Sequence, residues 1–294
     1  MEHLHIIENE SLRIIVADHG AELVSVWDKD SGSERIWTAD PAVWNRHAPI
    51  LFPFVGKVAD GKYRVNGKEY RMKTQHGFAR DLDFSCADET ACSVTHVLEA
   101  SDHTREIYPF DFRLTVRHSL CENQVRKLRV DWAVENTGNE RMYYSIGGHP
   151  GFLIPENVRK EDCLICFPGR ESLRYFGVNA SGFALPENRH DLICRDGKVC
   201  YQEDIPDTWI FDNQEIRTVG IALPDGTPFI TMDCGQFPML AVWANPKGSF
   251  ICLEPWFGRT DDEGFQGSLQ QKTGMEILEI RQKKEISYTI EFHG

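Results

Sequence analysis

A histidine flanked by glycines and a proline is the first group in this sequence that could move a proton. His149 stands in "YYSIGGHPGF", residues 143–152, where strand-type residues run into two glycines. Pro150 lacks a backbone N–H and pushes the preceding residue into an extended conformation. We therefore expect His149 at the end of a strand, presented to a ligand that the glycines allow to approach closely. A purely structural histidine is the alternative.

A glutamate in an apolar strand is the second such group. In "FICLEPWFGRTDD", residues 250–262, the alternation of a strand places Phe250, Cys252 and Glu254 on one face. A carboxylate on an apolar face costs free energy unless it is paired or used. We expect Pro255 to end the strand and Trp256 to offer an aromatic face to a sugar ring. The alternative is an edge glutamate in a structural salt bridge.

Basic side chains gather in a third stretch, residues 44–84. It contains Arg46, Lys57, His76 and Arg80, and its "HGFARD" segment places an imidazole before a glycine and a guanidinium four residues later. This arrangement suits a loop whose backbone approaches a ligand closely. The alternative is a surface turn that carries these residues incidentally.

The elements that must position these groups are strands. Apolar residues alternate with a period of two, and β-branched and aromatic residues are frequent, which predicts strands at 12–17, 22–27, 113–120, 125–134, 141–146, 218–223, 229–232, 240–243, 250–254 and 285–292. No amphipathic helix longer than about three turns is expected. Because no linker or repeat interrupts the strands, we expect one domain over residues 1–294, an all-β fold built as a large antiparallel β-sandwich.

Composition and charge narrow the function classes. The chain has 294 residues, of which 41% are hydrophobic and 26% charged, as in ordinary globular proteins. Its formal net charge of −13 argues against nucleic acid and anionic membranes as partners. The N-terminal stretch carries acidic residues through its only apolar run, so neither a signal peptide nor a membrane span is expected.

The cysteines predict a reducing, cytoplasmic location. There are nine, an odd number, scattered along the chain. Cys163 and Cys166 have the spacing of redox and zinc motifs, but a strand would point them to opposite faces. We interpret all nine as free thiols.

Taken in order, these stretches resemble the aldose 1-epimerase, or galactose mutarotase-like, family and in particular its LacX-like branch. The resemblance rests on "GAELVSVWDKDSG", "WNRHAPILFPFVGK", "QHGFARDLDF", "GGHPGF" and "CLEPWFG", which together span nearly the whole chain. It implies a galactose mutarotase-like supersandwich with an open cleft on one sheet.

The resemblance also implies roles for single residues. His149 would be the general acid at the ring oxygen and Glu254 the general base at the anomeric hydroxyl. His76 would be a third catalytic residue, beside His149, that helps to bind and polarise the ring or anomeric oxygen. Asp207, in "PDTWIF", would bind sugar hydroxyls, and Lys57 stands where the family usually carries an arginine. The candidates for substrate binding are Lys57, Asp207, Arg46, Arg80 and Trp256.

The implied reaction needs only one acid and one base. Removing the C1 hydroxyl proton while protonating the ring oxygen opens the ring, and rotation and reclosure give the other anomer. With unperturbed pKa values of about 4.3 and 6.5, a glutamate is ionised and a histidine is a usable acid near neutrality. No metal or organic cofactor is needed, and the sequence has neither a dinucleotide fingerprint nor a P-loop.

Two other functions stay open at this point. His76, His149 and Glu254 could form a two-histidine, one-carboxylate metal site. The chain could also be a sugar-binding or sensor protein without turnover. The sugar itself is undetermined, because Arg46, Lys57 and Arg80 could meet either a phosphate or hydroxyls.

Overall fold

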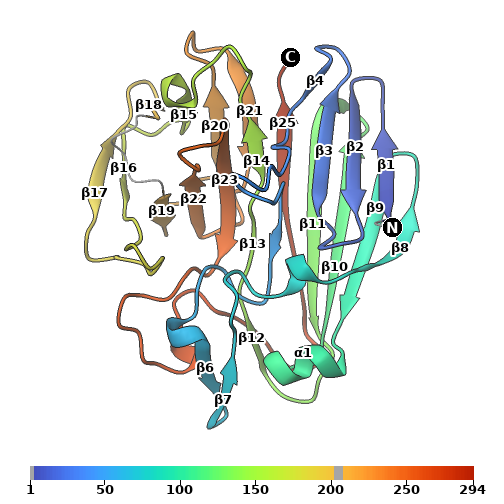
Figure 1. Ribbon diagram of the computed structural model, residues 1–294, viewed down its shortest axis with the longest axis vertical. Helices are drawn as coiled ribbons and strands as arrows, with labels where there is room; N and C mark the ends of the chain where they lie inside the picture. Colours follow the sequence, from blue (N-terminus) through green and yellow to red (C-terminus); the bar gives the residue numbers. More distant parts are fainter. Residues whose placement is uncertain (1–2, 202–207) are drawn as a thin grey trace.

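The computed structural model describes residues 3–201 and 208–294, and these residues are almost entirely in strands (Figure 1). The one α-helix among them, α1 (Asp102–Ile107), is capped by Ser101, whose hydroxyl accepts the backbone N–H of Thr104. Short 3₁₀ turns are η1 (Ala59–Gly61), η2 (Ala79–Asp81), η3 (Lys160–Asp162) and η4 (Leu269–Gln271). The predicted all-β fold is confirmed.

The largest sheet has nine strands in the order β18-β15-β20-β21-β25-β11-β10-β9-β8. Its strands are antiparallel neighbours with long pairings, such as that of β10 with β11. Their bounds are β8 (Ser85–Glu89), β9 (Ser93–Glu99), β10 (Phe112–Cys121), β11 (Gln124–Asn136), β15 (Leu164–Cys166), β18 (Lys198–Cys200), β20 (Thr218–Ala222), β21 (Pro228–Asp233) and β25 (Lys283–Phe292).

A six-stranded sheet has the order β19-β22-β23-β13-β5, with β14 also paired to β23. The register places Ala241 of β22 opposite Glu254 of β23. The bounds are β5 (Ile50–Leu51), β13 (Ile146–Gly148), β14 (Gly151–Leu153), β19 (Thr208–Asp212), β22 (Met239–Trp243) and β23 (Phe250–Phe257).

The remaining strands form a four-stranded N-terminal sheet, β1-β2-β3-β4, and three two-stranded pairs. In Figure 1, β1, β2 and β3 lie on the opposite side of the view from β19 and β22. The bounds are β1 (Leu4–Glu8), β2 (Leu12–Ala17), β3 (Leu23–Asp28), β4 (Ser33–Glu34), β6 (Lys62–Val65), β7 (Lys68–Arg71), β12 (Met142–Tyr144), β24 (Glu276–Leu278), β16 (Ser172–Tyr175) and β17 (His190–Ile193).

Two of the predicted strands differ from the structure by more than one or two residues at their ends. The stretch 141–146 is divided between β12, which pairs with β24, and β13, which pairs with β23 and β5. The strand predicted over 250–254 continues through Pro255 to Phe257, so Pro255 does not end it. On one side of β23, β13 and β14 pair with residues 256–257 and 250–252. Pro255 thus lies where this ladder is already interrupted, and its missing N–H is tolerated.

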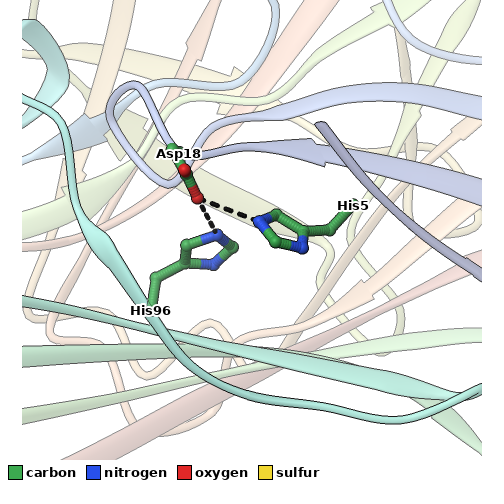
Figure 2. Close-up of side chains that lie close together, drawn as sticks. All are labelled: His5, Asp18 and His96. Atoms are coloured by element: carbon green, nitrogen blue, oxygen red, sulfur yellow. Dashed lines mark hydrogen bonds and ion pairs between the residues drawn. The ribbon is translucent and has the colours of Figure 1, made fainter. Parts of the chain in front are cut away.

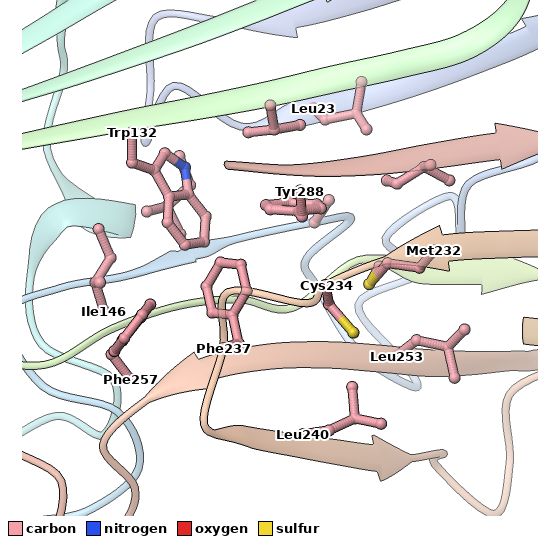
Figure 3. Close-up of a cluster of buried hydrophobic side chains, with 14 of the residues drawn as sticks. Leu23, Trp132, Ile146, Met232, Cys234, Phe237, Leu240, Leu253, Phe257 and Tyr288 are labelled. Atoms are coloured by element: carbon pink, nitrogen blue, oxygen red, sulfur yellow. The ribbon is translucent and has the colours of Figure 1, made fainter. Parts of the chain in front are cut away.

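The hydrophobic core includes side chains from the nine-stranded and the six-stranded sheets (Figure 3). Trp132 of β11 packs edge-on against Phe237 at 5.9 Å between ring centroids, and Phe237 packs against Phe257 of β23 at 5.1 Å. Leu253 lies on the same face of β23 as Phe257. This contact fixes one face of β23 in the core and leaves its other face for the site.

Two further features concern the cysteines and the helices. All nine cysteines are described, and all are free thiols. Among the residues that the structure describes, no helix combines the length and apolar composition that crossing a membrane requires.

Buried His118 of β10 predicts acid sensitivity. Burial lowers its pKa to about 3, so the unfolded chain binds this proton more readily than the folded one. Its contribution to stability is complete above the unfolded pKa of about 6.5 and is lost as the pH falls toward about 3. In urea unfolding, the free energy of unfolding should fall between pH 7 and pH 5 in both proteins. The fall should be about 2 kcal/mol smaller for His118→Leu than for the wild type. His103→Gln, on the exposed surface of α1, should retain the wild-type loss, and equal losses in all three proteins would contradict this account.

Candidate active site

A cleft of about 240 Å³ opens on the face of β23 that points away from the main core. Strands β19, β22 and β23 supply its floor, and the segments around residues 56–57, 75–80 and 149 supply its walls. Six of the residues predicted from the sequence line it: Lys57, His76, Arg80, His149, Glu254 and Trp256. The fold therefore brings together groups that lie up to about two hundred positions apart in the chain.

His149 lies in the two-residue gap between β13 and β14. Its backbone N–H donates to the carbonyl of Pro49 at 3.1 Å, which ties this strand end to the neighbouring loop. The imidazole is held between the indoles of Trp44, at 4.9 Å between ring centroids, and Trp243, at 5.4 Å. These contacts hold the ring in one orientation toward the floor of the cleft.

Glu254 provides the carboxylate that faces this imidazole. Its Oε2 lies 3.3 Å from Nε2 of His149, and the residue is only 1% exposed. The predicted alternation holds: Phe250 and Cys252 form an apolar cluster on the face of Glu254, whereas Ile251 and Leu253 belong to the main core. The strand thus places one carboxylate at the end of an apolar row, directly opposite a histidine.

Burial changes the acid-base properties of this pair. Burial, helped by the Arg80 guanidinium, lowers the pKa of His149 to about 3. Burial also raises the pKa of Glu254 well above its ordinary value, opposed only by the indole of Trp256. The unperturbed pKa values assumed from the sequence are therefore wrong for the cleft without a ligand, because burial removes the water that would solvate a charge on either side chain. The pair is favoured in its uncharged form, with one proton on Glu254.

His76 stands beside His149, with 5.6 Å between ring centroids. Its backbone has a positive φ of 68°, and it is held there because its N–H donates to the Gly56 carbonyl at 2.7 Å. The Gly56 N–H in turn donates to Nδ1 of His76 at 3.1 Å. Since Nδ1 accepts, the proton of the neutral ring is assigned to Nε2. Burial, with Arg80 nearby, lowers the pKa of His76 well below its ordinary value and keeps it neutral.

Lys57 belongs to a segment that is fixed by the residues following β23. The Lys57 N–H donates to the Thr260 hydroxyl at 3.0 Å, and the Asp261 carboxylate accepts the Ala59 N–H at 2.7 Å. Asp261 is itself paired with buried Lys272 at 2.6 Å. At the cleft the Lys57 ammonium donates to the Ser181 carbonyl at 2.8 Å. The ammonium group of Lys57 is thus attached to a backbone segment that hydrogen bonds hold in place.

Of the two predicted arginines, one lines the cleft and the other contacts the first. Arg80 lines the cleft and donates to the Gln75 carbonyl at 2.8 Å. Arg46 lies behind it, donating to the Arg80 carbonyl at 2.8 Å and pairing with Asp81. Arg46 therefore supports Arg80 and is not among the residues that line the cleft, and direct contact of Arg46 with a substrate stays a prediction. Asp207 lies outside the described residues.

Several lining residues were not identified from the sequence. Trp44, Trp243 and Asn245 come from loop and strand ends whose sequence pattern does not distinguish them from core residues. Trp44 begins the stretch 44–84 and lies two residues before Arg46, and this proximity is the only signal that the sequence offers for it. Its contact with His149 depends on tertiary packing alone.

The metal hypothesis of the sequence analysis required His76, His149 and Glu254 to converge. The described residues instead bring donor atoms of His149, Cys252 and Glu254 within 4.8 Å of one another. Burial, and to a lesser extent the neighbouring carboxyl of Glu254, raises the pKa of the Cys252 thiol well above its ordinary value. A protonated thiol is a poor ligand, so this set fits proton transfer better than metal binding.

Comparisons with known proteins agree with this geometry. The sequence pattern of the family described as "Aldose 1-epimerase" matches residues 3–181. Over 263 residues the chain is 29% identical to the protein "LacX, chromosomal" of Lactococcus lactis subsp. lactis, covering 86% of this chain and 87% of that one.

Two solved structures are similar over almost the whole chain. A galactose mutarotase related enzyme from Lactobacillus acidophilus has a TM-score of 0.92 and 29% identity, covering 99% of this chain and 98% of that one. A galactose mutarotase-like protein from Lactobacillus casei ATCC 334 has a TM-score of 0.89 and 31% identity, covering 99% and 100%. The fold implied by the sequence resemblance is therefore confirmed.

Gly147 should be required for the position of Trp256. A Cβ at Gly147 would lie 2.4 Å from Cδ1 of Trp256, its register partner on β23. Gly147→Ala should destabilise the protein by about 1–3 kcal/mol and alter near-ultraviolet circular dichroism, because the indole must move. At Gly235 the nearest atom to such a Cβ is at 3.5 Å, so Gly235→Ala is the control in the same thermal melts. Matching melting temperatures for the two variants would contradict this prediction.

Proposed function

This chain belongs to the aldose 1-epimerase family, and we propose that it interconverts the α and β anomers of an aldose or aldose phosphate. One observation carries the proposal: Nε2 of His149, in the wall of the cleft, lies 3.3 Å from Oε2 of Glu254, in its floor, and tryptophan side chains line the same cleft. An acid and a base at this spacing can reach two oxygens on the same anomeric carbon.

The proposed reaction needs two proton transfers and no redox change. Glu254 takes the proton of the C1 hydroxyl while His149 gives a proton to the ring oxygen, so the bond from C1 to the ring oxygen breaks and an open aldehyde forms. Rotation about C1–C2 and the reverse transfers close the ring as the other anomer. Each transfer contributes about 10²–10⁴-fold, which suffices for a reaction that also proceeds in water.

The uncharged resting pair is compatible with this cycle. Protonated Glu254 with neutral His149 contains the same number of protons as ionised Glu254 with cationic His149. The two forms differ by the transfer of one proton across the 3.3 Å contact. Hydroxyls of an entering sugar would solvate the charged form, which burial otherwise disfavours. Substrate binding would thereby produce the base and the acid together.

The other cleft residues are proposed to bind and orient the sugar. His76 would donate its Nε2 proton to an oxygen near the anomeric centre, since its Nδ1 is engaged by Gly56. Trp256 would pack on the C–H face of the ring, and Lys57 and Arg80 would meet hydroxyls or a phosphate. Asp207 remains a proposed hydroxyl ligand.

The nine free thiols support a reducing, cytoplasmic location.

The purified protein should speed anomer equilibration with no added cofactor. Freshly dissolved α-anomers of a panel of free and phosphorylated aldoses would be followed by NMR, with and without EDTA. We expect at least one sugar to equilibrate faster than in buffer, and we expect the rate to survive EDTA because proton transfer alone is used. Only spontaneous rates over the full panel, with sugar binding retained, would instead indicate a binding protein.

Replacing Glu254 should separate catalysis from folding. Glu254→Gln keeps the size of the side chain but removes its ability to exchange a proton, so kcat should fall about 10²-fold or more while sugar binding changes little. The melting temperature should change little as well, because the carboxyl is already favoured in its neutral form. Exposed Glu263, in the loop after β23, offers Glu263→Gln as a matched control with normal kcat. Near-normal turnover in a destabilised Glu254→Gln protein would assign this residue a structural role.

A further inference from the structure

Two histidines and an aspartate converge at a place that is separate from the cleft (Figure 2). His5 lies on β1, Asp18 directly follows β2, and His96 lies on β9. None of these three residues lines the cleft. Their strands lie on the opposite side of Figure 1 from β19 and β22, so the cluster takes no part in the proposed reaction.

Two of the three distances between the donor atoms are close to those of a metal site. Oδ1 of Asp18 lies 2.9 Å from Nε2 of His5 and 3.2 Å from Nε2 of His96, and the three atoms are all within 4.8 Å of one another. Ligand atoms about 2.0–2.2 Å from a tetrahedral Zn²⁺ are separated by roughly 3.3–3.6 Å. The two contacts to Asp18 therefore need to widen by only a few tenths of an ångström.

Neighbouring groups hold His5 and Asp18 in orientations suited to metal ligands. Oε2 of Glu89, at the end of β8, lies 2.9 Å from Nδ1 of His5, which leaves Nε2 of His5 directed at Asp18. A carboxylate behind a ligating histidine fixes its ring and tautomer. Asp18 is held through its backbone, because its N–H donates to the His3 carbonyl at 3.0 Å and its carbonyl accepts the Phe84 N–H at 2.9 Å.

Charge and ligand type favour a divalent transition metal. Among the described residues, the ion-pair partners of Asp18 and Glu89 are histidines alone, so with neutral rings the cluster carries two negative charges. His96 is fully buried, and two imidazoles select Zn²⁺ over Mg²⁺ or Ca²⁺. Cys86 is the register partner of His96 on the neighbouring strand. Potential ligand atoms of Cys86, His5 and Glu89 also lie within 4.8 Å of one another, so a thiol sulfur is close to the cluster.

We propose that His5, Asp18 and His96 form a Zn²⁺ site, with Glu89 orienting His5. The partly exposed Asp18 side chain leaves a route for the ion and a position for water. The site would join β1 and the turn after β2 to β9, and so fasten the N-terminal sheet to the nine-stranded sheet. It is a structural site and stabilises the folded chain.

Zinc binding by the whole chain tests this directly. Protein dialysed against EDTA and then against buffer would be titrated with Zn²⁺ in competition with a chromophoric chelator, and its melting temperature measured with and without Zn²⁺. We expect one Zn²⁺ per chain and a higher melting temperature with Zn²⁺ but not with Mg²⁺. His5→Gln and Asp18→Asn should each weaken binding at least 10-fold, and Glu89→Gln by about 10-fold or more.

The control is His19→Gln, which removes an exposed imidazole paired with a single carboxylate, Asp83, at 2.8 Å. This variant should bind Zn²⁺ like the wild type. Circular dichroism would verify folding, and Glu89→Gln, which alters no ligand and lies at a partly exposed position, keeps the test valid if another variant unfolds. Substoichiometric binding by the wild type, or equal binding by the wild type and the folded variants, would overturn the proposal.

Discussion

The 3.3 Å contact between His149 and Glu254 is the constraint on which the rest of the site depends. A buried carboxyl facing a buried imidazole is tolerable when the two groups share one proton, since separate charges would lack solvation. Burial pushes the pKa of each residue toward its neutral form. The same feature makes the pair responsive to a polar ligand, because added hydrogen bonds favour the charged form.

Side chains of the nine-stranded sheet pack behind the strand that precedes His149 and so maintain this contact. Gly148 ends β13 just before His149, and a Cβ there would lie 2.9 Å from the Tyr288 hydroxyl and 3.4 Å from the Trp132 ring. These two side chains belong to the nine-stranded sheet and pack against each other at 5.2 Å between ring centroids. The hydrophobic core therefore reaches the back of the strand that presents the histidine. Packing at interior density leaves little freedom for His149 to move away from Glu254.

The walls of the cleft are built differently from its floor. His76 and Arg80 come from a loop that is held by backbone hydrogen bonds, including those between His76 and Gly56. Arg46 supports this loop through the Arg80 carbonyl, and Asp261 anchors the segment of Lys57. The proposed catalytic pair is thus placed by β23 and by the junction between β13 and β14, whereas most of the groups proposed to select the sugar are placed by loops. Such a division lets specificity vary while the proton-transfer geometry is preserved.

The sequence by itself determined the all-β class, ten stretches that form strands and the ordered motifs of the site, because alternation reports local burial directly. It did not identify strands such as β1, β8, β9 and β19. It could place Glu254 on the same face as Cys252, but the continuation of β23 through Pro255 depended on the gap between β13 and β14. The division of 141–146 into two strands likewise depended on partners distant in the chain.

Only the tertiary structure decided which distant groups meet and in what environment. It placed Arg46 behind Arg80, set Trp44 against His149, and gathered residues 5, 18 and 96 into one cluster. It also replaced ordinary pKa values with those of a buried pair. The physical reason is that strand pairing and desolvation are non-local: they follow from what packs around a residue, which its neighbours in sequence do not specify.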